Sequence, residues 1–201
     1  MQSNNPTLIV IAGPNGSGKT SITTQILKHE WISNCVYINP DNIAQEEFGN
    51  WNNQENVIKA ANLARERRYK CIDNNESLIF ETVFSATDKI DFLILAKQKG
   101  YFIRLFFVGT NHPSINASRI AMRVIEGGHD VPISKIISRY TKSISNCCLT
   151  STFVDRIYVY DNSEDFTSAK LLFRGVDGVL EKSYQKINSW ALPILDSLKN
   201  N

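Results

Sequence analysis

An apolar run, a glycine-rich loop and a helix-forming segment follow one another near the start of the chain. The run Thr7–Ala12 is continuously apolar and rich in β-branched residues, which favours a strand buried on both faces. The loop Gly13–Thr20 matches the pattern G-x-x-x-x-G-K-[ST] at every fixed position, and helix-forming residues continue from Ser21. This succession predicts a phosphate-binding loop that leads from the first strand of an α/β sheet into a helix.

The residue types in this loop suit a nucleoside triphosphate. Small residues let successive backbone N–H groups turn toward a phosphate without side-chain clash. Lys19 can reach the β- and γ-phosphate oxygens, and the Thr20 hydroxyl can ligate Mg²⁺. We therefore predict ATP and Mg²⁺ as cofactors, with Thr20 as the metal ligand. The residues expected to bind the nucleotide here are Gly13, Pro14, Asn15, Gly16, Ser17, Gly18, Lys19, Thr20 and Ser21.

Further apolar runs alternate with helical stretches along the chain. The runs predicted as strands are Cys35–Asn39, Leu78–Glu81, Phe102–Val108 and Arg156–Tyr160. The stretches predicted as helices are about Lys19–Glu30, Gln54–Ile72, Lys89–Lys99, Asn116–Ile125 and Ser134–Cys147. This alternation predicts an α/β fold, a parallel sheet of about five strands with right-handed crossovers and helices on both faces.

The pattern changes after Asp161. The segments Ala169–Phe173 and Val179–Ser183 predict a small C-terminal hairpin, in which Gly178 can adopt a positive φ. A last amphipathic helix is expected from about Gln185 to Leu198, kinked or interrupted at Pro193. Because no linker or repeat interrupts the sequence, we predict a single domain over residues 1–201.

Composition excludes several classes of protein. Apolar residues make up 42% and charged residues 21%, which excludes a disordered or fibrous chain. Twenty-two Lys and Arg against 20 Asp and Glu leave a net charge of +2, so nucleic acid is not an expected partner. No signal peptide or membrane-spanning run is recognisable, and we expect a cytoplasmic protein. The cysteines fit buried free thiols in a reducing compartment, with redox sensing as the alternative: Cys35, Cys71, Cys147 and Cys148.

Other nucleotide-binding classes lack their motifs here. Neither N-K-x-D nor D-x-x-G, which GTPases carry, occurs in the sequence. A motor ATPase needs a hydrophobic strand that ends in an acid, and the nearest match, Ser77–Glu81, supplies a single Glu. The size suits a small-molecule kinase, in which catalysis is mainly positioning and electrostatic stabilisation. We therefore predict a P-loop kinase-like fold.

Two acids lie at predicted strand ends, where an acceptor hydroxyl would find a base. Asp41 follows the strand Cys35–Asn39 and is the candidate general base, although it could also cap the helix that follows. Glu81 and Thr82 end the next predicted strand and are candidates for substrate binding. Glu81 could equally be a strand-end acid or a distant Mg²⁺ partner.

Arginines mark the segment predicted as a helical lid, roughly residues 112–150. Arg119 and Arg123 lie one turn apart on one helix face, and Arg139 lies on the next predicted helix. Such residues could converge on the γ-phosphate and spread its charge, or they could belong to a solvated basic face. His129, between the two helices, could bind substrate or cap a turn.

With these residues assembled, the chain resembles the zeta toxin family of P-loop kinases, and most of all a compact branch often labelled a predicted ABC-type ATPase. The resemblance covers roughly residues 7 to 163, and its most specific part is the Gly-Gly-His-x-Val-Pro string followed by Arg-Tyr. The segments that carry it are Ile11–Thr20, Ile38–Ala44, Phe80–Thr82, Arg123, Gly127–Pro132, Arg139-Tyr140 and Tyr160–Ser163.

This resemblance implies an ATP-dependent kinase that phosphorylates the 3′-hydroxyl of the amino sugar in UDP-N-acetylglucosamine. By analogy, Lys19 binds phosphate, Asp41 is the general base and Glu81 holds the sugar nucleotide. Arg123 would neutralise the transferring phosphate, and Arg139 is the candidate for the second catalytic arginine. The other residues expected at the substrates are Thr82, Arg119 and His129 for the acceptor and Asn162 for the adenine.

Two other functions remain open at this point. The chain could phosphorylate a different small acceptor, such as a nucleoside, a nucleotide or an antibiotic. It could also be a switch that binds ATP for assembly without transferring phosphate. If the protein is a toxin, we expect its antitoxin to act in trans, because the phosphate-binding loop begins near residue 13.

Replacing Asp41 with Asn separates a kinase from a switch. The change removes the acceptor base, so we expect phosphoryl transfer to fall at least about 100-fold while ATP affinity stays within about twofold. Transfer from γ-labelled ATP and titration with a fluorescent ATP analogue measure the two quantities. Unchanged transfer in the variant would contradict the assignment of Asp41 as the base.

Overall fold

A single sheet organises the structure, which is a computed structural model that describes residues 5–29, 32, 34–49, 54–128 and 130–199. The strands within these residues are β1 (Thr7–Ala12), β2 (Val36–Ile38), β3 (Leu78–Thr82), β4 (Phe102–Gly109), β5 (Arg156–Asp161), β6 (Lys170–Val176) and β7 (Val179–Ser183). Their order in the sheet is β2-β3-β1-β4-β5-β6-β7. Strands β1 to β5 pair in parallel, and β6 and β7 continue the sheet in antiparallel pairing.

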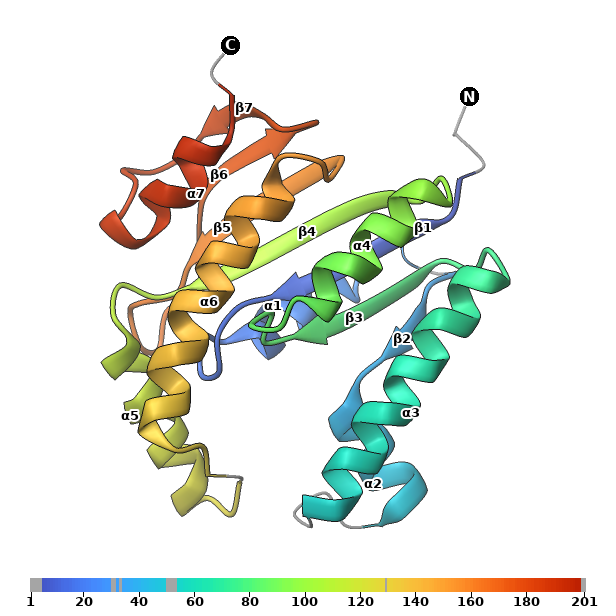
Figure 1. Cartoon of the computed structure of the whole chain (residues 1–201). Coiled ribbons are helices and arrows are strands. Elements are labelled where there is room, and N and C mark those ends of the chain that lie inside the picture. Colours follow the sequence, from blue (N-terminus) through green and yellow to red (C-terminus); the bar gives the residue numbers. More distant parts are fainter. Residues whose placement is uncertain (1–4, 30–31, 33, 50–53, 129, 200–201) are drawn as a thin grey trace.

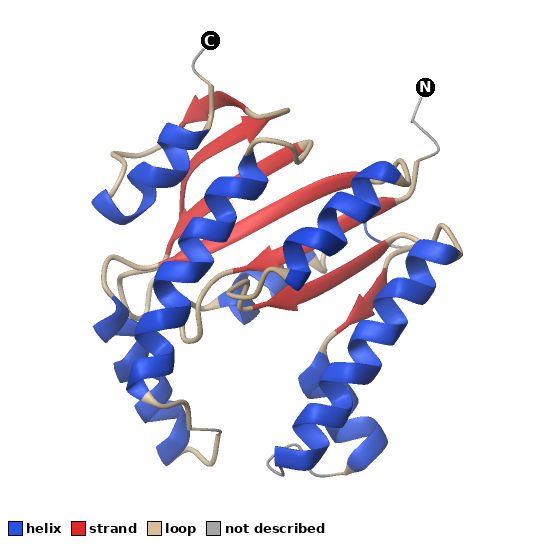
Figure 2. Ribbon diagram, in the orientation of Figure 1, coloured by secondary structure: helices blue, strands red, loops and turns tan. Residues whose placement is uncertain are grey.

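Helices cover both faces of this sheet, as predicted (Figures 1 and 2). They are α1 (Lys19–Ile26), α2 (Pro40–Phe48), α3 (Gln54–Asp73), α4 (Asp88–Gln98), α5 (Pro113–Ile125), α6 (Ile133–Ser151), the 3₁₀ turn η2 (Ser189–Ala191) and α7 (Leu192–Ser197). Along β1, Leu8 and Val10 face the larger core with α3, α4, α6 and α7, whereas Ile9 and Ile11 face α1. This alternation explains why β1 is apolar at every position. Within the described ranges, none of the helices combines the length and apolar character that a membrane crossing requires.

The C-terminal hairpin is confirmed, but it joins the main sheet, so the sheet has seven strands and not about five. β6 pairs with β5, and the turn residues Asp177 and Gly178 have φ values of 50° and 77°. A Cβ atom on Gly178 would lie 2.7 Å from the carbonyl oxygen of Thr152, so glycine is required there. The hairpin therefore packs against the end of α6.

The terminal helix is present but shorter than the predicted stretch from about Gln185 to Leu198, and it is not interrupted at Pro193. The backbone N–H of Tyr184 donates to the carbonyl of Leu172 at 2.8 Å, which keeps this stretch extended beside β6. The helical part is confined to η2 and α7, and Pro193 lies in the first turn of α7, where proline fits a helix. Helix α1 likewise ends at Ile26, earlier than predicted.

Two helical arms extend from the sheet on either side of the loop between β1 and α1 (Figure 1). One consists of α5 and the start of α6, and it corresponds to the segment predicted as a lid. The other consists of α2 and the start of α3. Helix α5 ends in a Schellman turn, in which the N–H of Gly128 donates to the carbonyl of Arg123 at 2.9 Å. The later half of α6 carries Cys147 into the main core, whereas no described residue of α5 or of the first turns of α6 belongs to that core.

The central strand β4 gives a direct test of this core. Leu105 is fully buried, so we expect Leu105→Ala to lower the free energy of unfolding by about 2–5 kcal/mol. The matched control is Leu149→Ala on α6, because Leu149 is 60% exposed and its loss should change stability by less than about 0.5 kcal/mol. Urea unfolding measures both, and similar losses would contradict the assigned core.

Candidate active site

The loop between β1 and α1 requires glycine at positions 16 and 18, because of backbone conformation and of lack of space. Gly16 and Gly18 have φ values of 73° and 88°, in the left-handed region. A Cβ on Gly16 would lie 2.7 Å from the carbonyl oxygen of Asn116, and a Cβ on Gly18 would lie 2.1 Å from Nδ2 of Asn162. Gly18 is also the N-cap of α1, whose first N–H groups and positive dipole end face the loop. The predicted strand, phosphate loop and helix are therefore all present.

The same two asparagines hold the outer side of this loop. The Asn116 amide donates to the carbonyl of Asn15 at 2.6 Å, and its Oδ1 accepts from the hydroxyl of Thr110. The Asn162 amide donates to the carbonyl of Ser17 at 2.9 Å. Because the carbonyls of Asn15 and Ser17 are satisfied from outside, the loop keeps a shape in which backbone amides can face a ligand. Asn162, predicted near the adenine, thus contacts the loop itself.

Lys19 lies along the loop that it follows. Its ammonium donates to the carbonyls of Gly13 and Pro14 at 3.0 and 3.1 Å. Burial lowers the pKa of Lys19 to about 8; the charge of Glu81 opposes this shift, Arg123 adds to it and Asp41 opposes it. The charges of both predicted acids and of one predicted arginine therefore act on the pKa of Lys19.

Asp41 and Glu81 lie at the ends of adjacent strands. Asp41 is exposed in the first turn of α2, just beyond β2, and Glu81 is half-buried in β3. The helix cap is Asn39 and not Asp41, because the Asn39 side chain accepts from the backbone N–H of Asp41 at 2.8 Å. The Asp41 carboxylate is thus not used as a cap. Glu81 accepts at Oε1 from the Tyr37 hydroxyl at 2.9 Å.

Thr82 connects β3 to the phosphate loop. Its carbonyl accepts from the N–H of Gly13 at 3.3 Å, and its hydroxyl accepts from the N–H of Phe84 at 3.0 Å. Phe84 is buried with a φ of 61°, a strained conformation for a bulky residue. The Thr82 hydroxyl therefore stabilises a turn beside the predicted acceptor site. Thr20 and Ser21 are exposed at the start of α1.

The three predicted arginines divide between two sides of the loop. Arg139 on α6 donates from Nη1 to Oδ1 of Asn15 at 3.2 Å. The stem of Arg123 packs where a Cβ on Gly128 would lie, 2.7 Å from its Cγ, so Gly128 gives Arg123 room. Arg119 instead turns to the loop after β5. His129, the fourth candidate on this arm, lies outside the described residues.

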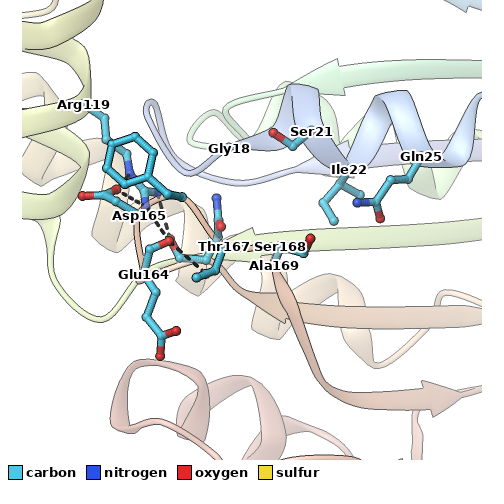
Figure 3. A pocket seen from close by; sticks show the side chains of 12 residues that line it. Gly18, Ser21, Ile22, Gln25, Arg119, Glu164, Asp165, Thr167, Ser168 and Ala169 are labelled. Carbon is cyan, nitrogen blue, oxygen red and sulfur yellow. Dashed lines mark hydrogen bonds and ion pairs between the residues drawn. The ribbon is translucent and has the colours of Figure 1, made fainter.

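Arg119 is fixed by the loop after β5. Its Nε donates to Oδ1 of Asp165 at 2.8 Å, and its Nη1 donates to the carbonyl of Asn162 at 2.8 Å. It lines a pocket of about 430 Å³ beside the start of α1. Figure 3 shows Ser21 and Gln25 of α1 along one wall and residues of the loop after β5 along the other. The lining residues are Gly18, Ser21, Ile22, Gln25, Arg119, Asn162 and residues 164–169.

Sequence reasoning missed three residues of this site. Asn116 is fully buried, and a polar residue one turn before the buried Ile120 is the signal that could have identified it. Tyr37 and Asn39 had no local signal, because a tyrosine and an asparagine at the end of a strand are common. Their hydrogen bonds depend on the pairing of β2 with β3.

Together, the parallel sheet, the glycine-dependent loop at the end of β1 and the lysine at its C-terminal end define a P-loop protein with a kinase-like fold. The chain belongs to the zeta toxin family, whose sequence model matches residues 1–169.

Comparison with individual proteins gives more distant similarities. The chain is 27% identical to an uncharacterized protein of Haemophilus influenzae over 132 residues. These residues cover 66% of this chain and 91% of that protein. A structure from the PezAT chromosomal toxin-antitoxin system of Streptococcus pneumoniae is similar in fold, with a TM-score of 0.65, 20% identity and coverage of 98% of this chain and 80% of that one. The AvrRxo1-ORF1:AvrRxo1-ORF2 structure with ATP has a TM-score of 0.64 at 19% identity, covering 89% of this chain and 61% of that one.

The pKa of Lys19 predicts how nucleotide affinity changes with pH. The ammonium form binds phosphate, and with a pKa of about 8 only about one tenth of the lysines carry the proton at about pH 9. We expect the Kd for ATP to rise roughly tenfold between about pH 7 and pH 9. Titration with a fluorescent ATP analogue measures this dependence.

Lys19→Arg is the matched control, because a guanidinium stays charged over this range. Its affinity should be weaker but nearly independent of pH. A wild-type affinity that does not change between the two pH values would show that Lys19 does not set the binding of phosphate.

Proposed function

We propose that the chain is an ATP-dependent kinase that transfers the γ-phosphate to a hydroxyl of a small acceptor, with UDP-N-acetylglucosamine as the first candidate. One observation carries the proposal: two carboxylates lie at neighbouring strand ends, Asp41 just beyond β2 and Glu81 in β3, and the charges of both oppose the lowering of the Lys19 pKa. A nucleotide switch has no need of an acceptor base beside Lys19, whereas phosphoryl transfer to a hydroxyl requires one.

The site residues take complementary parts in this reaction. Asp41 accepts the proton of the acceptor hydroxyl. The hydroxyl oxygen forms a bond to the γ-phosphorus, and the bond between the γ-phosphorus and the β-phosphate oxygen breaks to release ADP. Lys19 neutralises the β- and γ-phosphates, and Arg123 and Arg139 neutralise the transferring group. Glu81 accepts a hydrogen bond from the acceptor. Thr82 would also contact the acceptor.

The nucleotide base belongs in the pocket between α1 and the loop after β5. The pocket adjoins Gly18, and its volume suits a nucleoside. Arg119 presents a guanidinium that Asp165 and Asn162 already hold, which favours stacking on the base over contact with the acceptor. We therefore reassign Arg119 from the acceptor to the nucleotide.

The site suits a magnesium ion that is coordinated by one protein side chain and by phosphate oxygens of the nucleotide. The described residues contain no group of three or more His, Cys, Asp or Glu side chains that could hold a metal, whereas the Thr20 hydroxyl is exposed at the start of α1. Bound there with phosphate oxygens, Mg²⁺ would neutralise charge on the β- and γ-phosphates. Residues 1–201 would form one domain, with a lid of α5 and the first turns of α6.

An antitoxin that acts in trans is the partner that this family suggests. Two of the similar structures support it, since one comes from a toxin-antitoxin system and the other is a complex of two proteins. Such a partner would inhibit the kinase by covering the phosphate loop.

Label transfer identifies the acceptor. Purified protein is incubated with γ-labelled ATP, Mg²⁺ and a panel that contains UDP-N-acetylglucosamine, other sugar nucleotides, nucleosides and aminoglycosides, with Lys19→Ala as the inactive control. We expect label on UDP-N-acetylglucosamine and at least about 100-fold less label with the variant, because Lys19 stabilises the transferred charge. Label on another acceptor would show that the substrate is not UDP-N-acetylglucosamine. Label on no acceptor would contradict the kinase function.

A further inference from the structure

We propose that Tyr37 is a positioning residue of the acceptor site, which holds Glu81 toward the acceptor and ties it to the helix that bears Asp41. This inference rests on the proposed kinase function. Its basis is a chain of hydrogen bonds: the Tyr37 hydroxyl donates to Oε1 of Glu81 at 2.9 Å, and Asn39 Nδ2 donates to the Tyr37 oxygen at 2.9 Å. The Asn39 Oδ1 completes the chain by accepting from the N–H of Asp41 at 2.8 Å.

Chemistry fixes the direction of every bond in this chain. The backbone N–H of Asp41 can only donate, so the Asn39 oxygen must face it and the Asn39 nitrogen must face Tyr37. The tyrosine oxygen therefore accepts from Asn39, and its single proton goes to the Glu81 carboxylate. Burial and the nearby carboxylates hold the pKa of Tyr37 well above its ordinary value, so the proton stays in place at any working pH. The chain has one arrangement, which gives it the rigidity that positioning requires.

Glu81 needs such a partner because Lys19 attracts it. Among the neighbouring charges, that of Glu81 has the largest effect on the pKa of Lys19. A glutamate side chain has three rotatable bonds and would turn toward the ammonium if nothing held it. Tyr37 occupies Oε1 and so leaves Oε2 to accept a hydrogen bond from the acceptor. The parallel pairing of Ile38 with Phe80 then fixes the spacing between the two carboxylates.

Tyr37→Phe tests this role, because it removes the hydroxyl and keeps the ring. We expect KM for UDP-N-acetylglucosamine to rise about tenfold or more, as for the loss of a hydrogen bond to a charged group, while KM for ATP stays within about twofold. The matched control is Tyr158→Phe. Tyr158 packs against the same small cluster on the α1 face, and its ring stacks on Phe106 with centroids 4.7 Å apart. This control should leave both KM values unchanged.

A double-mutant cycle with Glu81→Gln separates positioning from a structural effect. If Tyr37 acts through Glu81, Tyr37→Phe should change KM for the acceptor by less than about twofold in the Glu81→Gln background. The inference would be overturned, and the kinase function left standing, by either of two results. One is that Tyr37→Phe raises KM for the acceptor as much in the Glu81→Gln background as in the wild type. The other is that Tyr37→Phe and Tyr158→Phe have equal effects on KM in the wild-type background. A wild-type protein that transfers no label would refute the kinase function and the inference with it.

Discussion

The backbone of the phosphate loop imposes the central constraint on this structure. Its amides must face inward to bind phosphate, so its carbonyls face outward and need donors. Asn116 from α5 and Asn162 from the end of β5 supply two of these donors, at 2.6 and 2.9 Å. The glycines at 16 and 18 are required by the same contacts, since a Cβ would collide with these asparagines or their backbone. The loop, the arm and the β5 end therefore form one unit.

This unit explains how charges are distributed around Lys19. The arm places Arg123 and Arg139 on one side of the loop, and the strand ends of β2 and β3 place Asp41 and Glu81 on the other. In the proposed reaction, the positive groups would neutralise phosphate charge and a carboxylate would take the proton of the hydroxyl. Arg119, one turn from Arg123, pairs with Asp165 instead and lines the pocket beside α1.

Local signals predicted most of the fold and part of the site. The phosphate loop, the parallel strands and the turn at Gly178 follow from residues that are adjacent in sequence. The terminal helix begins later than predicted because the hydrogen bond between the backbone groups of Tyr184 and Leu172 outweighs a helical pattern. The sequence alone did not reveal the contacts of Asn116, Tyr37 and Arg119 for a related reason. Each depends on a partner between 44 and 101 residues away: Asn15, Glu81 and Asp165.

The central claim is that the loop, the arm and the two strand ends make a single site for phosphoryl transfer. A crystal structure of the protein with Mg²⁺ and a non-hydrolysable ATP analogue tests it most directly. The account predicts that the Lys19 ammonium leaves the carbonyls of Gly13 and Pro14 for the γ-phosphate, that this phosphate faces Asp41, and that the base lies beside Arg119. A γ-phosphate that faces away from Asp41, or a base bound elsewhere, would contradict it.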